Sequence, residues 1–289
     1  MPDLRALMQL MRLPAVFTAW SNIIAAHLIA TAGHVEWRYL IWTVIASSAI
    51  YLAGMVLNDC FDLSEDRRDR PGRPLPSGAV PVRFAWLLGA GLLAAGLTAA
   101  ALAGTRVLFW AVPLIGLVVL YDGGAKHGRF GEVTMAGCRY LNWIMGLSVM
   151  PVDGAAWLIP LPIFLYTLSL TTLSAIEVDS TDRQRVAWSI AGMVAAGLSM
   201  IGLTLLGVLA DPLGLVAAGA LFVIVIMRLL KVRQDTTPET VQAAMKTLII
   251  GIIPLDAALL ATDGRYLAAV LLLLLLIPSK ILSRRIYIT

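Results

Sequence analysis

The chain has 289 residues, of which 59% are hydrophobic and only 14% are charged, and its mean hydropathy is +0.84. Soluble domains carry charge on about a quarter of their residues, so this composition excludes an ordinary soluble protein. The net charge is +4. In so apolar a chain, basic residues indicate how the protein is oriented in a membrane, and we expect no nucleic-acid partner.

Apolar blocks of about 20 residues recur along the whole chain, and a helix of about that length crosses the hydrocarbon core of a bilayer. They predict one integral membrane domain over residues 1–289, an all-α bundle of nine or ten transmembrane helices. The predicted spans are 13–32, 38–58, 81–103, 106–121, 132–150, 157–178, 186–209, 212–231, 239–261 and 266–282.

Two of these spans contain polar residues that affect the count. The first holds Thr18 and Asn22, and we interpret it as a retained helix and not as a cleaved signal peptide. The span 239–261 holds Lys246, Pro254 and Asp256, and the count falls to nine if it does not cross. We expect Asp256 to serve helix packing or a re-entrant segment.

Basic residues gather on one predicted side of the bundle. That side receives Arg5, Arg12, Arg67, Arg68, Arg70, Arg73, Arg83, Lys126, Arg129, Arg183, Arg185, Lys231, Arg233, Lys280, Arg284 and Arg285, and the other side receives Arg38, Arg106 and Arg265. Because cytoplasmic loops collect Lys and Arg, this distribution places the polar face in the cytoplasm. We expect a multi-pass protein of a bacterial inner (plasma) membrane whose active site faces the cytoplasm.

The segment after the second span places oxygen-bearing side chains on one helical face. At about 100° per residue, Asn58, Asp62 and Asp66 fall at roughly 0°, 40° and 80°, and Asp59 falls at roughly 100°. Ionised groups this close together repel and are costly near hydrocarbon, so a cation is expected to complete the cluster. Oxygen donors of this kind suit Mg²⁺. The alternative is a solvated helix end with ordinary surface acids.

The next segment is rich in arginine and proline. Its prolines stiffen the loop, and its arginines lie beside the expected Mg²⁺ site. Guanidinium groups form forked hydrogen bonds with phosphate oxygens, so Arg70 and Arg73 are predicted to bind a diphosphate. Arg67 and Arg68 fit either that role or simple anchoring on the cytoplasmic side.

These motifs resemble those of a known family. The pattern Asn-Asp-x-x-Asp-x-x-x-Asp at residues 58–66, followed by Arg-Pro-x-Arg-Pro-Leu-x-Ser-Gly at residues 70–78, is similar to the first signature of the UbiA superfamily of intramembrane prenyltransferases. The resemblance implies helices around a central cavity, in which Mg²⁺ binds an isoprenyl diphosphate. It also implies a lateral opening through which the prenyl tail reaches the lipid bilayer.

Further residues follow from the same resemblance. Tyr121 and Lys126 match the family's Tyr-x(4)-Lys stretch after the fourth helix, which implies that Lys126 binds phosphate, with simple anchoring on the cytoplasmic side as the alternative. In the fifth helix, Arg139 and Asn142 share a face and are expected to line the cavity near the diphosphate or the acceptor, with an internal structural pair with a carboxylate as the alternative. Arg12 and Asn22 fit a cavity role or a structural role equally.

A second acidic patch departs from the family pattern. The family's second signature has aspartates four residues apart, whereas Asp179 and Asp182 are three apart, and Glu177 would face away from them on a helix. Either Glu177 is not a ligand, or the helix breaks before Asp179. The two patches together give the predicted metal ligands Asn58, Asp59, Asp62, Asp66, Asp179, Asp182 and Glu177. This patch and the Arg-x-x-Asn pair look like the EboC-like branch of the family.

The predicted reaction is Mg²⁺-assisted alkylation of an unidentified acceptor by an isoprenyl diphosphate, with Asp59, Asp62 and Lys126 as the catalytic residues. We expect no obligatory protein partner. One alternative is a transporter or lipid-binding protein, but such a protein would place charges near the middle of the membrane and not at helix ends. The other alternative is a different lipid-phosphate transferase that uses the same metal.

Overall fold

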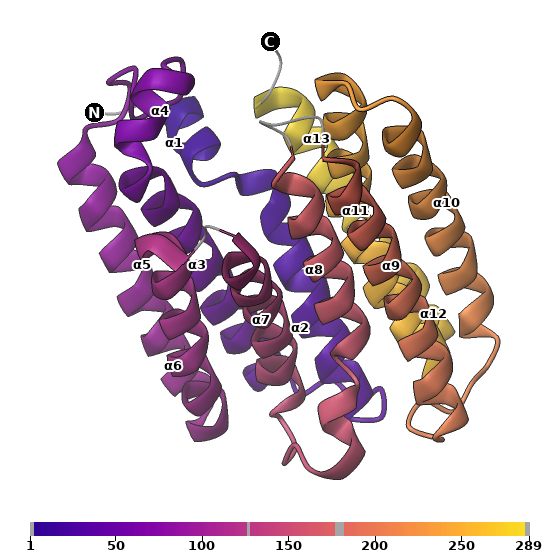
Figure 1. The fold of residues 1–289 in the computed structure, drawn as a ribbon. Coiled ribbons are helices and arrows are strands. Elements are labelled where there is room, and N and C mark those ends of the chain that lie inside the picture. Colours follow the sequence, from indigo (N-terminus) through magenta and orange to yellow (C-terminus); the bar gives the residue numbers. More distant parts are fainter. Residues whose placement is uncertain (1–2, 126–127, 177–181, 287–289) are drawn as a thin grey trace.

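The computed structural model of this chain describes residues 3–125, 128–176 and 182–286. In these ranges the chain forms a bundle of roughly antiparallel helices, with no strand (Figure 1). Three of the predicted site residues, Lys126, Glu177 and Asp179, lie outside the described residues, so their assignments stay predictions.

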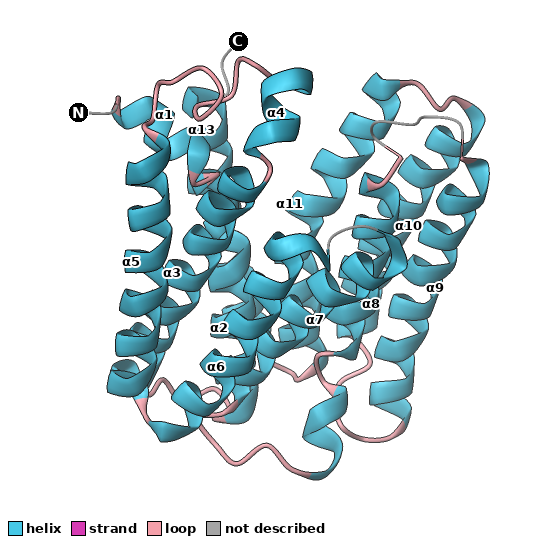
Figure 2. Ribbon diagram, turned by 60° about the vertical axis from the view of Figure 1, so that its left-hand side comes forward, coloured by secondary structure: helices cyan, strands magenta, loops and turns pink. Residues whose placement is uncertain are grey.

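The first half of the chain carries the acidic and arginine-rich motifs. Its helices are α1 (Leu4–Leu10), α2 (Val16–Ala30), α3 (Trp37–Phe61), α4 (Leu63–Asp69), α5 (Val82–Ala103), α6 (Thr105–Leu120) and α7 (Gly128–Leu147). The short helix α4 lies at the same end of the bundle as α1 (Figures 1 and 2).

The second half packs against the first where α8 meets α7 and where α11 meets α2. Its helices are α8 (Leu161–Ser174), α9 (Arg183–Leu205), α10 (Gly214–Gln234), α11 (Pro238–Thr262), α12 (Tyr266–Leu273) and α13 (Leu276–Ile286). Each predicted span coincides with a helix, and the doubtful span 239–261 is the continuous helix α11. The predicted all-α membrane bundle is confirmed.

Nine helical segments of the described chain are long and apolar enough to cross a membrane, and α7 is not among them. Helix α7 lies inside the bundle against α2, α6 and α8, so much of its surface meets protein and not lipid (Figure 1). Its Trp143, Ile144 and Met145 are fully buried. A helix in this position can carry polar residues, because neighbouring helices supply their partners.

The two ends of the described chain lie at the same end of the bundle (Figure 1). Gln9 Nε2 donates a hydrogen bond of 2.9 Å to the Ile286 carbonyl, and Ser279 Oγ donates one of 2.9 Å to the Pro14 carbonyl. The chain therefore crosses the bundle an even number of times, which favours the prediction of ten crossings over that of nine.

The close approach of α7 to α2 depends on Gly146. A Cβ atom added there would lie 2.7 Å from the Ala26 Cβ and 3.1 Å from the Ile23 carbonyl oxygen. The Ile23 oxygen belongs to the backbone of α2 and has little room to move. Gly202 in α9 has no such neighbour within 4 Å.

We predict that Gly146→Ala destabilises the protein by about 1–3 kcal/mol through overpacking. Gly202→Ala is the matched control and should be neutral or slightly stabilising, because alanine favours a helix interior. Thermal unfolding in detergent measures both. Equal unfolding midpoints for the two variants would contradict the close helix contact.

Candidate active site at the arginine-rich end of the bundle

The chain bends between α3 and α4, inside the acidic segment. Helix α3 ends at Phe61 and α4 begins at Leu63, so the four oxygen-bearing residues do not share one uninterrupted helix, as the sequence led us to expect. The Asp62 amide still donates to the Asn58 carbonyl at 2.9 Å, and the Asp66 amide donates to the Asp62 carbonyl at 2.8 Å. The i, i+4 spacing is therefore kept through the bend.

Arginines neutralise the two most deeply buried carboxylates of this face. Asp59 is 5% exposed and Asp66 is 4% exposed. Arg12 Nη2 lies 3.3 Å from Asp59 Oδ1, and Arg73 Nη1 lies 2.9 Å and 2.7 Å from the two oxygens of Asp66. Buried carboxylates without such partners would be strongly destabilising, so the arginines explain why this face is tolerated.

Both carboxylates converge on a single nitrogen atom of Arg73. Its Nη1 lies 2.7 Å from Asp66 Oδ2 and 3.7 Å from Asp59 Oδ1, so one cation position is shared by the two acids. Among the described residues, no three carboxylate, imidazole or thiol side chains are grouped so that they could hold a metal ion. A metal at this position would take its remaining ligands from amide oxygens, water, phosphate or the undescribed acids.

The loop between α4 and α5 fixes the position of Arg73. Leu75 is 2% exposed and Val80 is fully buried, and both pack into an apolar cluster with Val56 and Cys60 of α3. The Val80 amide donates to the Pro74 carbonyl at 3.0 Å. These contacts hold the loop over the end of α3, with Arg73 aimed at the acids.

Arg68 takes no part in this arrangement. It is exposed on α4, and its Nε donates to Asp69 Oδ1 at 2.9 Å. This hydrogen bond lowers the pKa of the Asp69 carboxyl. The contact favours the anchoring interpretation of Arg68 over a diphosphate-binding role.

Two adjoining cavities meet at Arg12. The first, which we call the polar chamber, opens at the end of the bundle and is lined by Gln9, Arg12, Asp59, Arg70, Gly72, Arg73 and Pro74. The second, which we call the apolar chamber, has a volume of about 150 Å³ and runs between α2, α3, α6 and α7. Its wall is mainly aliphatic and aromatic, and it includes the predicted residues Asn58, Tyr121, Arg139 and Asn142.

Asp122 is a site residue that the sequence analysis missed. It is 4% exposed and lines the apolar chamber. Its Oδ1 accepts a hydrogen bond of 3.2 Å from Asn58 Nδ2, while its Oδ2 has no hydrogen-bond partner in the described part of the chain. The turn that carries it lies further inside the bundle than the ends of α5 and α8 (Figures 1 and 2). An acid directly after Tyr121 was the signal available in the sequence.

A buried polar network supports the wall of the apolar chamber. Asp256 of α11 is fully buried and accepts hydrogen bonds from Ser21 Oγ at 2.5 Å, Asn22 Nδ2 at 2.7 Å and Trp143 Nε1 at 3.1 Å. Arg139 donates to Asn22 Oδ1 at 3.1 Å and to Thr18 Oγ1 at 2.7 Å. Asp256 thus joins α11 to α2 and α7, as expected of a helix-packing residue.

Asn142 belongs to the same network. It accepts a hydrogen bond of 2.7 Å from Ser47 Oγ of α3 and donates one of 3.4 Å to the Ala19 carbonyl of α2. It also lines the apolar chamber with Arg139. The predicted pair therefore does face the cavity. Its hydrogen bonds within the described chain run to uncharged groups and not to the carboxylate that the alternative expected.

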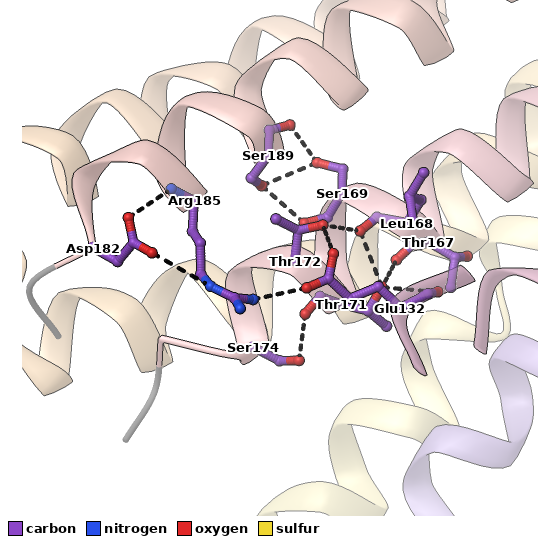
Figure 3. Close-up of polar contacts among 10 residues, drawn as sticks. All are labelled: Glu132, Thr167, Leu168, Ser169, Thr171, Thr172, Ser174, Asp182, Arg185 and Ser189. Carbon is purple, nitrogen blue, oxygen red and sulfur yellow. Dashed lines mark hydrogen bonds and ion pairs between the residues drawn. The ribbon is translucent and has the colours of Figure 1, made fainter. Parts of the chain in front are cut away.

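Asp182, the described member of the second acidic patch, caps helix α9. Its Oδ1 accepts from the Gln184 amide at 3.0 Å and from the Arg185 amide at 3.2 Å, and Figure 3 shows the second of these contacts. Arg185 in turn lies 2.8 Å from Glu132 Oε1 of α7, and Thr172 donates to Glu132 Oε2 at 2.7 Å. This cluster ties α7, α8 and α9 together, and the proposed metal role of Asp182 stays a prediction.

Comparison with known proteins places the chain in a family. The model of the UbiA prenyltransferase family matches residues 19–250, which includes most residues that line the two chambers but not Gln9 or Arg12. The chain belongs to the UbiA prenyltransferase family. The comparisons do not support the narrower assignment to the EboC-like branch.

The curated relatives of this UbiA-family chain are archaeal enzymes. It is 32% identical to the digeranylgeranylglyceryl phosphate synthase of Metallosphaera sedula over 167 residues, which are 54% of this chain and 59% of that enzyme. It is 29% identical to the synthase of the same name from Saccharolobus solfataricus over 176 residues, 60% of this chain and 62% of that enzyme. The matched part spans about three fifths of these relatives.

Solved structures share the fold over nearly their whole length. The UbiA homologue from Aeropyrum pernix K1 superposes with a TM-score of 0.66 at 18% identity, over 86% of this chain and 97% of that one. The UbiA homologue from Archaeoglobus fulgidus bound to GPP and Mg²⁺ has a TM-score of 0.63 at 13% identity, over 90% and 99%. At this identity the likeness establishes the fold.

We predict that Asp256→Leu destabilises the protein by about 3 kcal/mol or more, because it leaves three buried donors without their acceptor. Asp256→Asn keeps one acceptor oxygen and should cost less. Thr247→Ala is the control on the same helix, since that hydroxyl donates to the Ala243 carbonyl of α11 itself. Unfolding midpoints in detergent compare the three variants. An unchanged midpoint for Asp256→Leu would contradict the hydrogen-bond network around this carboxylate.

Proposed function

We propose that this protein is an intramembrane prenyltransferase that moves an isoprenyl group from an isoprenyl diphosphate to an acceptor, with Mg²⁺-assisted loss of diphosphate. The observation that carries the proposal is the meeting of two chambers at Arg12. One is lined by three arginines and the carboxylate of Asp59, and the other is mainly apolar. A molecule with an anionic head and a hydrocarbon tail matches both.

The residues of the polar chamber fit a bound Mg²⁺ ion. Asp59 and Asp66 already share one cation position, held here by Arg73 Nη1. We propose that Asn58 and Asp62, which follow the same i, i+4 spacing as Asp66, supply further oxygens. Mg²⁺ prefers such oxygens and commonly completes its shell with water and substrate phosphate. When bound, the ion would neutralise the charge that develops on the departing diphosphate. The Archaeoglobus homologue bound to GPP and Mg²⁺ supports this assignment.

The arginines would bind the phosphate oxygens. In the described structure Arg12 and Arg73 are paired with Asp59 and Asp66, whereas Arg70 lines the same chamber. A diphosphate with its cation would let these guanidinium groups turn from carboxylate to phosphate, keeping each charge paired throughout. Lys126 is proposed as a further phosphate contact.

The apolar chamber would shield the reacting carbon. In the proposed step the allylic C–O bond breaks and its electron pair leaves on the diphosphate. An electron pair of the acceptor then forms the new bond to the allylic carbon, and the acceptor releases a proton to the diphosphate or to solvent. Exclusion of water from the chamber prevents hydrolysis of the allylic cation.

The relatives indicate which substrates to try first. They are named for digeranylgeranylglyceryl phosphate, a glyceryl phosphate that carries two geranylgeranyl groups, so geranylgeranyl diphosphate and a geranylgeranylated glyceryl phosphate are the first donor and acceptor to test. The acceptor of this chain is a separate question, because the match covers only part of those enzymes.

The side of the membrane is also part of the proposal. We infer that the polar chamber faces the cytoplasm, because the arginine-rich loop and both ends of the described chain share one end of the bundle (Figure 1). Localisation to a bacterial inner membrane rests on the sequence interpretation, and the relatives named above are archaeal.

We predict that Asp62→Ala lowers the turnover of a prenyl diphosphate by about 10²-fold or more, because it removes a carboxylate from the cation-binding face. Asp69→Ala, on the exposed side of α4, is the matched control and should retain activity. Product mass and diphosphate release measure the activity of both variants. Thermal unfolding checks that both variants are folded. Full activity of Asp62→Ala, or of the wild-type enzyme in excess chelator, would contradict the proposal.

We predict that Arg73→Gln raises KM for the prenyl diphosphate by roughly 10- to 100-fold, since it removes a charged phosphate contact. Arg68→Gln replaces an equally charged residue of the same segment that pairs with Asp69, and it should leave KM unchanged. Steady-state kinetics in detergent micelles compare the two. If both variants shift KM alike, the loop acts by general charge and not through Arg73.

A further inference from the structure

Asp122 is a carboxylate in a place where charge is costly. It is 4% exposed, and it lies in the segment Thr105–Ala125, which is apolar enough to cross a membrane. Among the described residues, it is the one acid that lines the apolar chamber. An ionisable residue inside a membrane segment indicates a functional role, and its partner shows which role that is.

Asn58 is the hydrogen-bond partner of this carboxylate. Asn58 Nδ2 donates to Asp122 Oδ1 at 3.2 Å, while Oδ2 accepts no hydrogen bond from the described part of the chain. The charged neighbours of Asp122 are Arg12 and Asp59, so the pair lies at the junction of the two chambers. The hydrogen bond therefore links the wall of the apolar chamber to a residue of the proposed cation-binding face.

The packing of α3 against α6 brings the two residues together. A Cβ atom added at Gly54 of α3 would lie 3.0 Å from Val118 Cγ1 of α6, so the helices approach closely where residue 54 has no side chain. Gly54 precedes Asn58 by four residues and Val118 precedes Asp122 by four, which is about one helical turn in each case. The close contact in one turn thus places Asp122 beside Asn58 in the next.

This hydrogen bond fixes which way the Asn58 amide points. An amide group has one oxygen and one NH₂ group, whereas an ionised carboxylate can only accept hydrogen bonds. The Asn58 nitrogen therefore faces Asp122, and the Asn58 oxygen is turned away from it. An amide in the opposite orientation would present its N–H groups to a cation and could not bind it.

We propose that Asp122 is a positioning residue of the metal site, which holds the Asn58 amide with its oxygen available to Mg²⁺. This inference rests on the Mg²⁺-dependent function proposed above. Asp122 acts through Asn58 and does not bind the ion itself. Residues that orient a metal ligand through a hydrogen bond commonly contribute about 10- to 100-fold to metal affinity.

The charge of Asp122 has a second effect that must be separated from this one. A negative charge close to the proposed cation site attracts any cation, whatever the orientation of the Asn58 amide. The two effects differ in their dependence on Asn58. Orientation requires the Asn58 side chain, whereas attraction by charge persists when that side chain is removed.

Binding of Mn²⁺, measured by electron paramagnetic resonance, reports on the metal site without turnover. Purified protein in detergent is titrated with Mn²⁺ in the presence of an unreactive thiolo analogue of geranylgeranyl diphosphate. We expect Asp122→Ala and Asn58→Ala each to raise the Kd for Mn²⁺ by about 10-fold. The double variant should also lose about 10-fold, whereas independent effects would multiply to roughly 100-fold.

Two further variants complete the experiment. Asp122→Asn keeps the size of the side chain in case Asp122→Ala does not fold, and it should also weaken Mn²⁺ binding because its amide can face Asn58 in either orientation. Asp69→Ala removes an exposed acid that pairs with Arg68, and it should leave the Kd within about two-fold of wild type. Unfolding midpoints check that each variant is folded.

Three results would overturn the inference. An unchanged Kd for Mn²⁺ in folded Asp122→Ala or Asp122→Asn would show that the metal site does not need this carboxylate. A roughly 100-fold loss in the double variant would show that Asp122 acts by its charge and not through Asn58. Absence of Mn²⁺ binding by the wild-type protein would overturn the metal-dependent function itself, and this inference with it.

Discussion

Carboxylates gathered at the end of a membrane helix must be neutralised, and the rest of the site is arranged around that requirement. Asp59 and Asp66 are almost fully buried, yet each lies within ion-pair distance of an arginine. One of those arginines comes from the segment before α2 and the other from the loop before α5. The acidic face therefore draws together three separate parts of the chain, and charge pairing accounts for both the packing of this end and its proposed chemistry.

Buried charge deeper in the bundle is also stabilised by neighbouring helices, but in a different way. Helix α7 carries an arginine and an asparagine into the protein interior, where α2, α3 and α11 supply hydrogen-bond partners to them and to their network. At the polar chamber the positive and negative charges are matched in direct pairs. Arg139 is instead held by hydrogen bonds to the uncharged side chains of Thr18 and Asn22, and Asn22 links it to the carboxylate of Asp256.

Local patterns in the sequence were sufficient for the helices and for the acidic face, because both depend on residues close together in the chain. The apolar blocks located each span, and the i, i+4 spacing of Asn58, Asp62 and Asp66 persists in the backbone hydrogen bonds. Contacts between distant segments were not accessible in this way. Nothing in the sequence paired Arg73 with Asp66, brought Asp122 to Asn58 or joined Asp256 to α2, since each contact depends on how the helices pack.

We propose that a divalent cation and a diphosphate replace Arg73 as the partner of Asp59 and Asp66. The most direct test locates Mn²⁺, by its anomalous scattering, in crystals grown with an unreactive thiolo analogue of geranylgeranyl diphosphate. We expect Mn²⁺ on the face formed by Asn58, Asp59, Asp62 and Asp66, with Arg73 turned to the phosphate oxygens. Mn²⁺ and diphosphate bound elsewhere, with Arg73 still on Asp66, would contradict it.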